Sequence, residues 1–220
     1  MKMTMQRAGA VSALIIAASY IFGFGLFIGV LDRSGYTGPS GDLAFVIDNQ
    51  LWLSAAMIAL YVIAGCALVV LGLAFHERLK CSSAGLASVV KAFAMIWAGL
   101  VIASGFVGLI GIETIVAISA TDFPAAVSAW IAISVVQNAL GGGIELVGGV
   151  WMLLISWIAL ASNAANKGLH YLGGLIGVMG VATVVPGLGD VAAVFGLSQI
   201  IWFVWIAFDM FKHHGSDIKP

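Results

Sequence analysis

Charged side chains are scarce in this chain. Only 9% of its 220 residues are Asp, Glu, Lys or Arg, whereas a soluble domain carries about 25%. The sequence is instead 62% hydrophobic, with a mean hydropathy of +1.12. This composition leaves no room for a separate soluble catalytic domain. Because the chain also lacks a basic patch, we expect no nucleic-acid partner.

Cysteines and signature motifs are also few. Cys66 and Cys81 fall in segments expected at different depths, so a disulfide is not predicted. Neither cysteine has the CxxC partner of a thiol-based metal or redox motif. The sequence contains no P-loop, GxSxG or HExxH motif. We therefore predict a protein that is not an enzyme and that carries no cofactor.

Long apolar segments dominate what remains. A helix needs about 20 apolar residues to cross the hydrocarbon core, and backbone groups in lipid must be paired within the segment. The first run of 24 residues is too long for the 7–15-residue core of a signal peptide, so we expect it to be retained. The sequence predicts an all-α, six-transmembrane-helix bundle that forms a single membrane domain over residues 1–220. Its predicted helices cover approximately 8–31, 51–75, 92–120, 139–161, 169–185 and 191–211, with 125–138 as a tilted extension or an interfacial helix.

The basic residues predict an orientation. Positively charged residues favour short cytoplasmic loops. With six spans, an N-terminus inside the cell places eight basic residues on the cytoplasmic side and only Arg33 outside. We therefore expect both termini in the cytoplasm and the chain in a bacterial inner membrane. The eight residues are Lys2, Arg7, Arg78, Lys80, Lys91, Lys167, Lys212 and Lys219.

The fourth predicted helix carries a stripe of small and polar residues. At 100° per residue, the members of this stripe lie within about 60° of Glu145. We expect the stripe to face the interior of the bundle, with a bend at Gly141-Gly142-Gly143. The stripe consists of Asn138, Gly141, Glu145, Gly148, Gly149, Met152, Ser156 and Asn163.

Two glutamates lie inside the predicted spans. Glu113 precedes the end of the third helix at Ala120, and Glu145 follows the start of the fourth at Ala139, so both are expected roughly 10 Å from the outer boundary. Charges at membrane depth are costly, and two adjacent carboxylates retain a proton or share a cation. One hypothesis is a proton or cation site built from Glu113, Glu145, Asn138 and Gln137. The alternative is two neutral glutamates that hydrogen-bond the helices together or reach the interface.

Two weaker patterns concern histidine and glycine. All four histidines are expected near the cytoplasmic face, where Glu77 or Asp209 could complete a divalent metal site. Their spacing matches no metal motif, so imidazoles beside lipid headgroups are the preferred interpretation and no metal is predicted. These histidines are His76, His170, His213 and His214. The GxxxG pairs Gly25–Gly29 and Gly173–Gly177 predict close helix packing within the chain rather than a dimer contact.

Three glycine-rich segments resemble a family of uncharacterised bacterial six-helix integral membrane proteins. They are Leu109-Ile110-Gly111-Ile112-Glu113, Gly142-Gly143-Ile144-Glu145 and Leu172-Gly173-Gly174-Leu175-Ile176-Gly177. The chain departs from that group in having no arginine before Glu113. The resemblance implies six helices and a domain of unknown function, and it implies no activity.

Two function classes follow from these observations. The first is a small proton- or cation-coupled transporter or permeation protein that uses Glu113 and Glu145. The second is a non-enzymatic accessory or assembly subunit that scaffolds a membrane partner. The expected partners are the lipid bilayer, a proton or cation, and either another membrane protein or a second copy of the chain. An interior cavity lined by the third and fourth helices favours the first class, and a fully packed interior favours the second.

Overall fold

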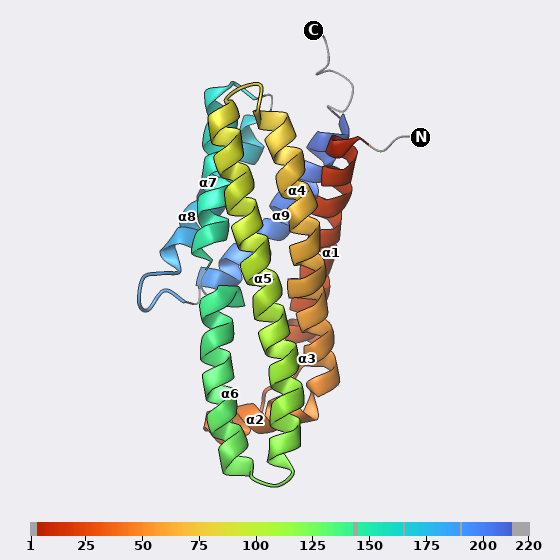
Figure 1. Cartoon of the computed structure of the whole chain (residues 1–220), viewed down its shortest axis with the longest axis vertical. Helices are drawn as coiled ribbons and strands as arrows, with labels where there is room; N and C mark the ends of the chain where they lie inside the picture. Colours follow the sequence, from red (N-terminus) through yellow and green to blue (C-terminus); the bar gives the residue numbers. More distant parts are fainter. Residues whose placement is uncertain (1–3, 143–144, 165, 190, 213–220) are drawn as a thin grey trace.

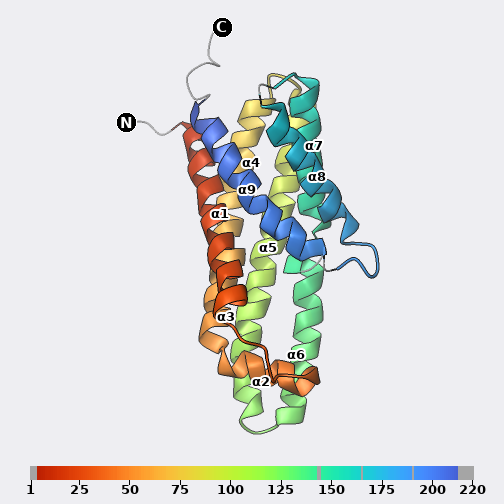
Figure 2. The ribbon, with the colours of Figure 1, turned by 180° about the vertical axis from the view of Figure 1, so that it is seen from behind.

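The computed structural model describes residues 4–142, 145–164, 166–189 and 191–212, and every regular element in these ranges is helical. Most helices run along the long axis of the molecule, whereas α8 and α9 run obliquely to it and α2 crosses one end (Figures 1 and 2). Two segments, η1 and η2, have the wider π-helical turn. In chain order the elements are α1 (Met5–Gly29), α2 (Gly38–Asp48), α3 (Gln50–Met57), η1 (Ile58–Ile63), α4 (Ala64–Leu79), α5 (Ala84–Ser119), α6 (Phe123–Gln137), η2 (Asn138–Gly142), α7 (Leu146–Ala161), α8 (Lys167–Ala182) and α9 (Val191–Lys212).

Five helical stretches are long and apolar enough to cross a membrane, counting only the described residues. They are Met5–Gly29, Gln50–Leu79, Ala84–Ser119, Phe123–Ala161 and Val191–Lys212. The predicted fifth span, 169–185, is the 16-residue helix α8. At 1.5 Å per residue α8 is about 24 Å long, which is short for a 30 Å hydrocarbon core. The chain therefore has the helices of a membrane protein, with five of crossing length where six were predicted.

Side-chain caps fix where several helices begin. The hydroxyl of Ser83 accepts the backbone N–H of Leu86 at the start of α5. The carboxylate of Asp122 accepts the backbone N–H of Ala125 at 2.9 Å, and Pro124 follows in the first turn of α6. An acidic cap and an early proline are strong start signals for a helix. The fourth helical stretch therefore begins at Phe123, so residues 125–138 extend the fourth predicted helix, which is one of the two alternatives predicted for them.

The two ends of the molecule differ in charge. α1 and α8 begin, and α4 and α9 end, at one end, which we call the basic end (Figure 1). Six of the seven Lys and Arg residues in the described ranges belong to these helix ends, their flanking turn or the first turns of α5. They are Arg7, Arg78, Lys80, Lys91, Lys167 and Lys212. The seventh, Arg33, precedes α2 at the opposite end and pairs with Asp42.

Six helices form a closed ring in the half of the molecule toward the basic end. Neighbours in contact run α1, α4, α5, α7, α8, α9 and back to α1. Their inner faces enclose a buried cluster of aromatic rings, in which the centroids of Trp97 and Trp151 are 5.5 Å apart. Packed rings from four helices thus fill the space where a channel would run. The cluster comprises Phe75, Trp97, Trp151, Phe195, Trp202 and Phe203.

A smaller second core occupies the other half, where α2 lies across the ends of α5 and α6 (Figure 2). It is built from buried aliphatic and aromatic side chains of α1, α2, α3, α5 and α6. Its main members are Leu26, Leu43, Phe45, Leu53, Ile112, Ile115 and Ala126. The molecule therefore has two packed cores along its length.

Glycine sets the close contact between α7 and α8. A Cβ added to Gly149 would lie 2.7 Å from the carbonyl oxygen of Gly177 and 2.6 Å from the backbone nitrogen of Val181. The predicted packing of the Gly173–Gly177 pair is confirmed by this approach. The prediction for the other pair is wrong, because an added Cβ at Gly25 or Gly29 meets no atom within 4 Å.

Candidate functional site

A cavity of about 300 Å³ lies between the two cores. Along α1, for example, Ala17 belongs to the first core, Tyr20 and Phe24 line the cavity, and Leu26 belongs to the second core. The same order holds along the stretch from α3 to α4, where Tyr61 lines the cavity. The described lining residues are Tyr20, Phe24, Phe27, Leu60, Tyr61, Val101, Gly141, Glu145, Ala192, Ala193, Phe195, Gly196 and Gln199.

The helices that border this cavity are interrupted beside it. Leu60 and Tyr61 lie in the π-helical segment η1, and Gly141 lies in η2. Gly141 has φ of +132°, a conformation that residues with a side chain rarely adopt, so the predicted bend is present there. α7 starts directly after Glu145, and Ala192 belongs to the first turn of α9. Irregular helical turns of this kind occur frequently at functional sites.

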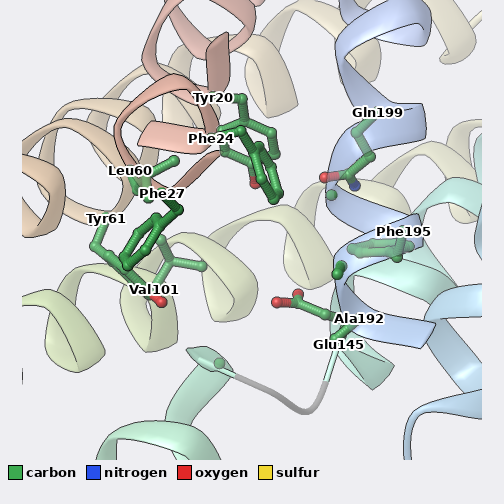
Figure 3. A pocket seen from close by; sticks show the side chains of 13 residues that line it. Tyr20, Phe24, Phe27, Leu60, Tyr61, Val101, Glu145, Ala192, Phe195 and Gln199 are labelled. Atoms are coloured by element: carbon green, nitrogen blue, oxygen red, sulfur yellow. The ribbon is translucent and has the colours of Figure 1, made fainter. Parts of the chain in front are cut away.

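Four polar side chains from separate parts of the chain converge on the cavity. Figure 3 shows Glu145, Tyr61 and Gln199 directed into the space from three sides, with Tyr20 beside them. The carboxyl group of Glu145 and the hydroxyl groups of both tyrosines belong to residues of this one lining. No lysine, arginine or histidine is among the described residues that line the cavity. The charge of Glu145 therefore has no cationic partner in that lining.

Gln199 is the most unusual of the four groups. Its side chain is 0% exposed, and neither its amide nitrogen nor its amide oxygen has a hydrogen-bond partner in the protein. Buried polar groups are almost always paired, and an unpaired one costs about 1–3 kcal/mol. An unpaired amide that lines a cavity is therefore a group ready to bind water or a ligand.

The backbone of Glu145 is held in place by α8. Its N–H donates to the hydroxyl of Thr183 at 2.8 Å, and that hydroxyl donates to the carbonyl oxygen of Gly180 at 2.7 Å. The carbonyl oxygen of Glu145 accepts the N–H of Gly149 at 2.8 Å. The glycine contact between α7 and α8 thus fixes the main chain of Glu145, while its side chain faces the cavity.

Glu113 lies elsewhere. On α5 it is twelve residues beyond Val101, or about 18 Å along the helix axis. Its side chain is exposed and lines a second, open cavity together with Gln50 and Ser54 of α3. The structure does not bring the two glutamates together, because α6 places the stretch before Glu145 alongside α5 and carries Glu145 farther from the turn at Asp122.

The two predicted neutral partners also separate from Glu145. The side chain of Gln137 is buried, and its amide nitrogen lies 3.1 Å from the sulfur of Met57. Asn138 is exposed. On the predicted stripe, Gly148, Gly149, Met152 and Ser156 are buried as expected, whereas Asn163 is exposed.

The histidines give no metal centre in the described part of the chain. His170 is buried at the start of α8 and His76 is half-buried near the end of α4, while His213 and His214 lie outside the described residues. No group of three or more His, Cys, Asp or Glu residues with the geometry of a metal site occurs among the described residues. Asp209 instead pairs with Arg78 and accepts a hydrogen bond from Asn166.

Sequence reasoning found Glu145 but missed Tyr20, Tyr61 and Gln199. Tyrosine normally lies at the membrane interface, so Tyr61 in the middle of an apolar run was an available signal. Gln199 in the middle of the last apolar segment was another.

No protein-family model, no curated protein and no solved structure matches this chain.

Proposed function

We propose that this chain is a small membrane transport or permeation protein that binds a cation at Glu145. The observation that carries the proposal is a carboxyl group in a cavity between the two cores whose described lining contains no basic residue. A carboxylate at membrane depth is unfavourable by several kcal/mol unless it is neutralised. A proton or another cation supplies that neutralisation.

The interrupted helices support movement of the bound ion. Transporters commonly place their ion sites near the bilayer midplane, at helices that break or end there. Here η1, η2, the residue that precedes α7 and the first half of α9 border one cavity. Between the cavity and the basic end lies the aromatic cluster, since Phe195 lines the cavity and its ring centroid is 6.4 Å from that of Trp97. The arrangement is that of a site blocked toward one end by packed rings.

The proposal includes an orientation. The basic end faces the cytoplasm, because it carries six of the seven basic residues in the described ranges. Both termini are then cytoplasmic, as expected for a protein of a bacterial inner membrane. Cysteine labelling from each side of the membrane tests this orientation, because Cys81 lies in the turn between α4 and α5 and is exposed.

Ion flux in reconstituted vesicles tests the function. The purified chain is placed in liposomes that contain a pH-sensitive dye, and gradients of H⁺, Na⁺, K⁺ or an organic cation are imposed in turn. Glu145→Gln removes the charge but keeps the shape, so we expect flux to fall at least tenfold. Glu113→Gln is the matched control, since Glu113 lines a different cavity, and we expect it to stay within twofold of the unaltered protein.

The same experiment separates transport from a scaffolding role. Equal flux from the unaltered protein and the Glu145→Gln variant contradicts a site at Glu145. Absence of flux above that of empty vesicles, together with stoichiometric co-purification of another membrane protein, favours an accessory subunit instead.

A further inference from the structure

Aromatic rings form much of the surface around Glu145. Five of the described lining residues are Tyr or Phe, contributed by α1, η1 and α9. The faces of aromatic rings attract cations within about 6 Å, and quaternary ammonium groups are bound in this way. The lining therefore combines one acid with several rings, and Figure 3 shows the rings from α1 and η1 across the space from Glu145, with Phe195 on the same side as Glu145. The rings are those of Tyr20, Phe24, Phe27, Tyr61 and Phe195.

The oxygen atoms of the described lining side chains are too few to complete the coordination shell of a divalent metal ion. Ca²⁺ takes six to eight oxygen ligands, and Mg²⁺ requires near-octahedral coordination. The described lining offers the carboxylate of Glu145, the amide oxygen of Gln199 and the hydroxyls of Tyr20 and Tyr61, beside apolar groups. No histidine or cysteine lines the cavity among the described residues, so the ligands preferred by zinc and copper are missing from that lining.

The volume of the cavity favours a ligand that has an apolar part in addition to its charged group. An apolar cavity of about 150 Å³ is enough to hold benzene. A space of about 300 Å³ is twice that size, and it therefore suits roughly a dozen non-hydrogen atoms. A proton or an alkali ion alone would leave most of this apolar space unfilled. A ligand with a positive head and a small apolar body would fill it.

Gln199 adds a directional requirement. Its two amide atoms are buried and unpaired in the protein, and the residue lines the same cavity as Glu145. A ligand that carries a hydroxyl or N–H group beside its charge pairs with this amide and relieves the cost of leaving it unpaired. Recognition then involves a charge at Glu145, rings around the cation, and a hydrogen bond at Gln199.

We infer that the cation bound at Glu145 is a small organic ammonium ion of up to about a dozen non-hydrogen atoms that carries a hydroxyl or N–H group. This inference rests on the proposed function, since it names the class of cation that the same site takes. It differs from a proton or metal-ion site in requiring the rings as well as the carboxylate.

Isothermal titration of the purified chain in an uncharged detergent tests the inference. The probes are choline, ethanolammonium and phenethylammonium, with 3,3-dimethylbutan-1-ol as the uncharged analogue of choline and NaCl, KCl and MgCl₂ as inorganic salts. We expect saturable binding of at least one ammonium ion and at least tenfold weaker binding of the uncharged analogue. In Glu145→Gln this preference for the charged probe should disappear.

Ring variants separate an aromatic site from a simple ion pair. Phe24→Leu keeps an apolar side chain but removes a ring from the cavity, and we expect about three- to thirtyfold weaker ammonium binding. Phe106→Leu is the matched control, because Phe106 is exposed on α5 and does not line the cavity. Its affinity should match that of the unaltered protein.

The outcomes distinguish this inference from the proposed function. If an inorganic cation binds in a Glu145-dependent way and no ammonium ion does, the organic ligand class is wrong and the cation site stands. Equal binding of choline and its uncharged analogue overturns the inference, as does unchanged affinity in Phe24→Leu. If no cation binds to the folded protein, as judged by its melting curve, both proposals fail.

Discussion

Two acids inside the ring of helices have opposite surroundings. Asp209 on α9 is buried, pairs with Arg78 of α4 and accepts a hydrogen bond from Asn166, which precedes α8. Glu145 precedes α7, lines a cavity of about 300 Å³ and has no basic residue in the described lining. The first acid joins three parts of the bundle, whereas the second faces space that a ligand can occupy.

The effects of removing each acid on stability and on ligand binding separate a structural acid from a functional one. Removing one partner of a buried ion pair strongly destabilises the folded protein, because the remaining charge is left unpaired in a medium of low dielectric constant. An acid that has no basic partner in the lining of its cavity contributes no such pairing, so we expect the fold to tolerate its removal and only ligand binding to change. The two acids therefore predict opposite patterns of stability and function.

Removal of Arg78 is expected to have the largest effect on stability. Arg78→Met leaves Asp209 buried without its guanidinium partner, and we expect a loss of about 3 kcal/mol. Glu145→Gln should leave the free energy of unfolding unchanged or raise it, since an unneutralised acid is removed. Unfolding of both variants in detergent micelles, followed by circular dichroism, measures the contrast.

The double variant Arg78→Met, Asp209→Asn is the control. It removes both charges, so most of the lost stability should return. If the double variant is as unstable as Arg78→Met, the loss reflects packing of the arginine stem rather than an unpaired acid. A strong destabilisation by Glu145→Gln would remove the distinction between the two acids.

A smaller effect is expected where α7 meets α8. Gly149→Ala puts a Cβ within 2.8 Å of backbone atoms of α8, which cannot move aside as a side-chain tip can. We expect a loss of about 1–3 kcal/mol from overpacking. Weaker cation binding should accompany it, because the same contact holds the main chain of Glu145.

Gly25→Ala is the matched substitution on α1. An added Cβ there meets no atom within 4 Å, so stability should be unchanged or slightly higher. A melting temperature that falls equally in both variants would show that the close approach of α7 to α8 is not required. Ammonium titration of both variants separates a shift of Glu145 from general destabilisation.

The sequence predicted the parts of the fold that depend on local pattern. Apolar length identified the five crossing stretches, because backbone pairing in lipid leaves few alternatives to a helix. It did not show that α8 is short, nor that α6 lies alongside α5. The start signal at Asp122 and Pro124 was present, but a long apolar run after it does not reveal where the helix bends.

The candidate site was only partly predictable. Glu145 was identified because an acid on a stripe of small residues must face the interior of a bundle. Its neighbours Tyr20, Tyr61 and Gln199 come from α1, η1 and α9, and only the closure of the ring between α1 and α9 brings them together. The depth of Glu145 relative to Glu113 depended on the path of α6, which composition does not encode.

The smallest effect on stability is expected at an exposed acid, Asp48, which extends the comparison of Asp209 with Glu145. Asp48 at the end of α2 accepts a hydrogen bond from the hydroxyl of Tyr36 at 2.8 Å, and this bond raises the pKa of Tyr36 above its ordinary value of 10.0. Because the pKa is raised in the folded state, the stabilisation is fully present below pH 10 and is lost as the pH rises through the folded value. Tyr36→Phe should therefore melt slightly below the unaltered protein at pH 8, and the gap should close as the pH rises through the raised pKa of Tyr36. A gap that persists at high pH would contradict this account, because the variant keeps the ring that packs on Phe45, 5.4 Å away between centroids, and lacks only the hydroxyl. Since Asp48 is exposed and Tyr36 is only half-buried, we expect a much smaller shift than that of Arg78→Met.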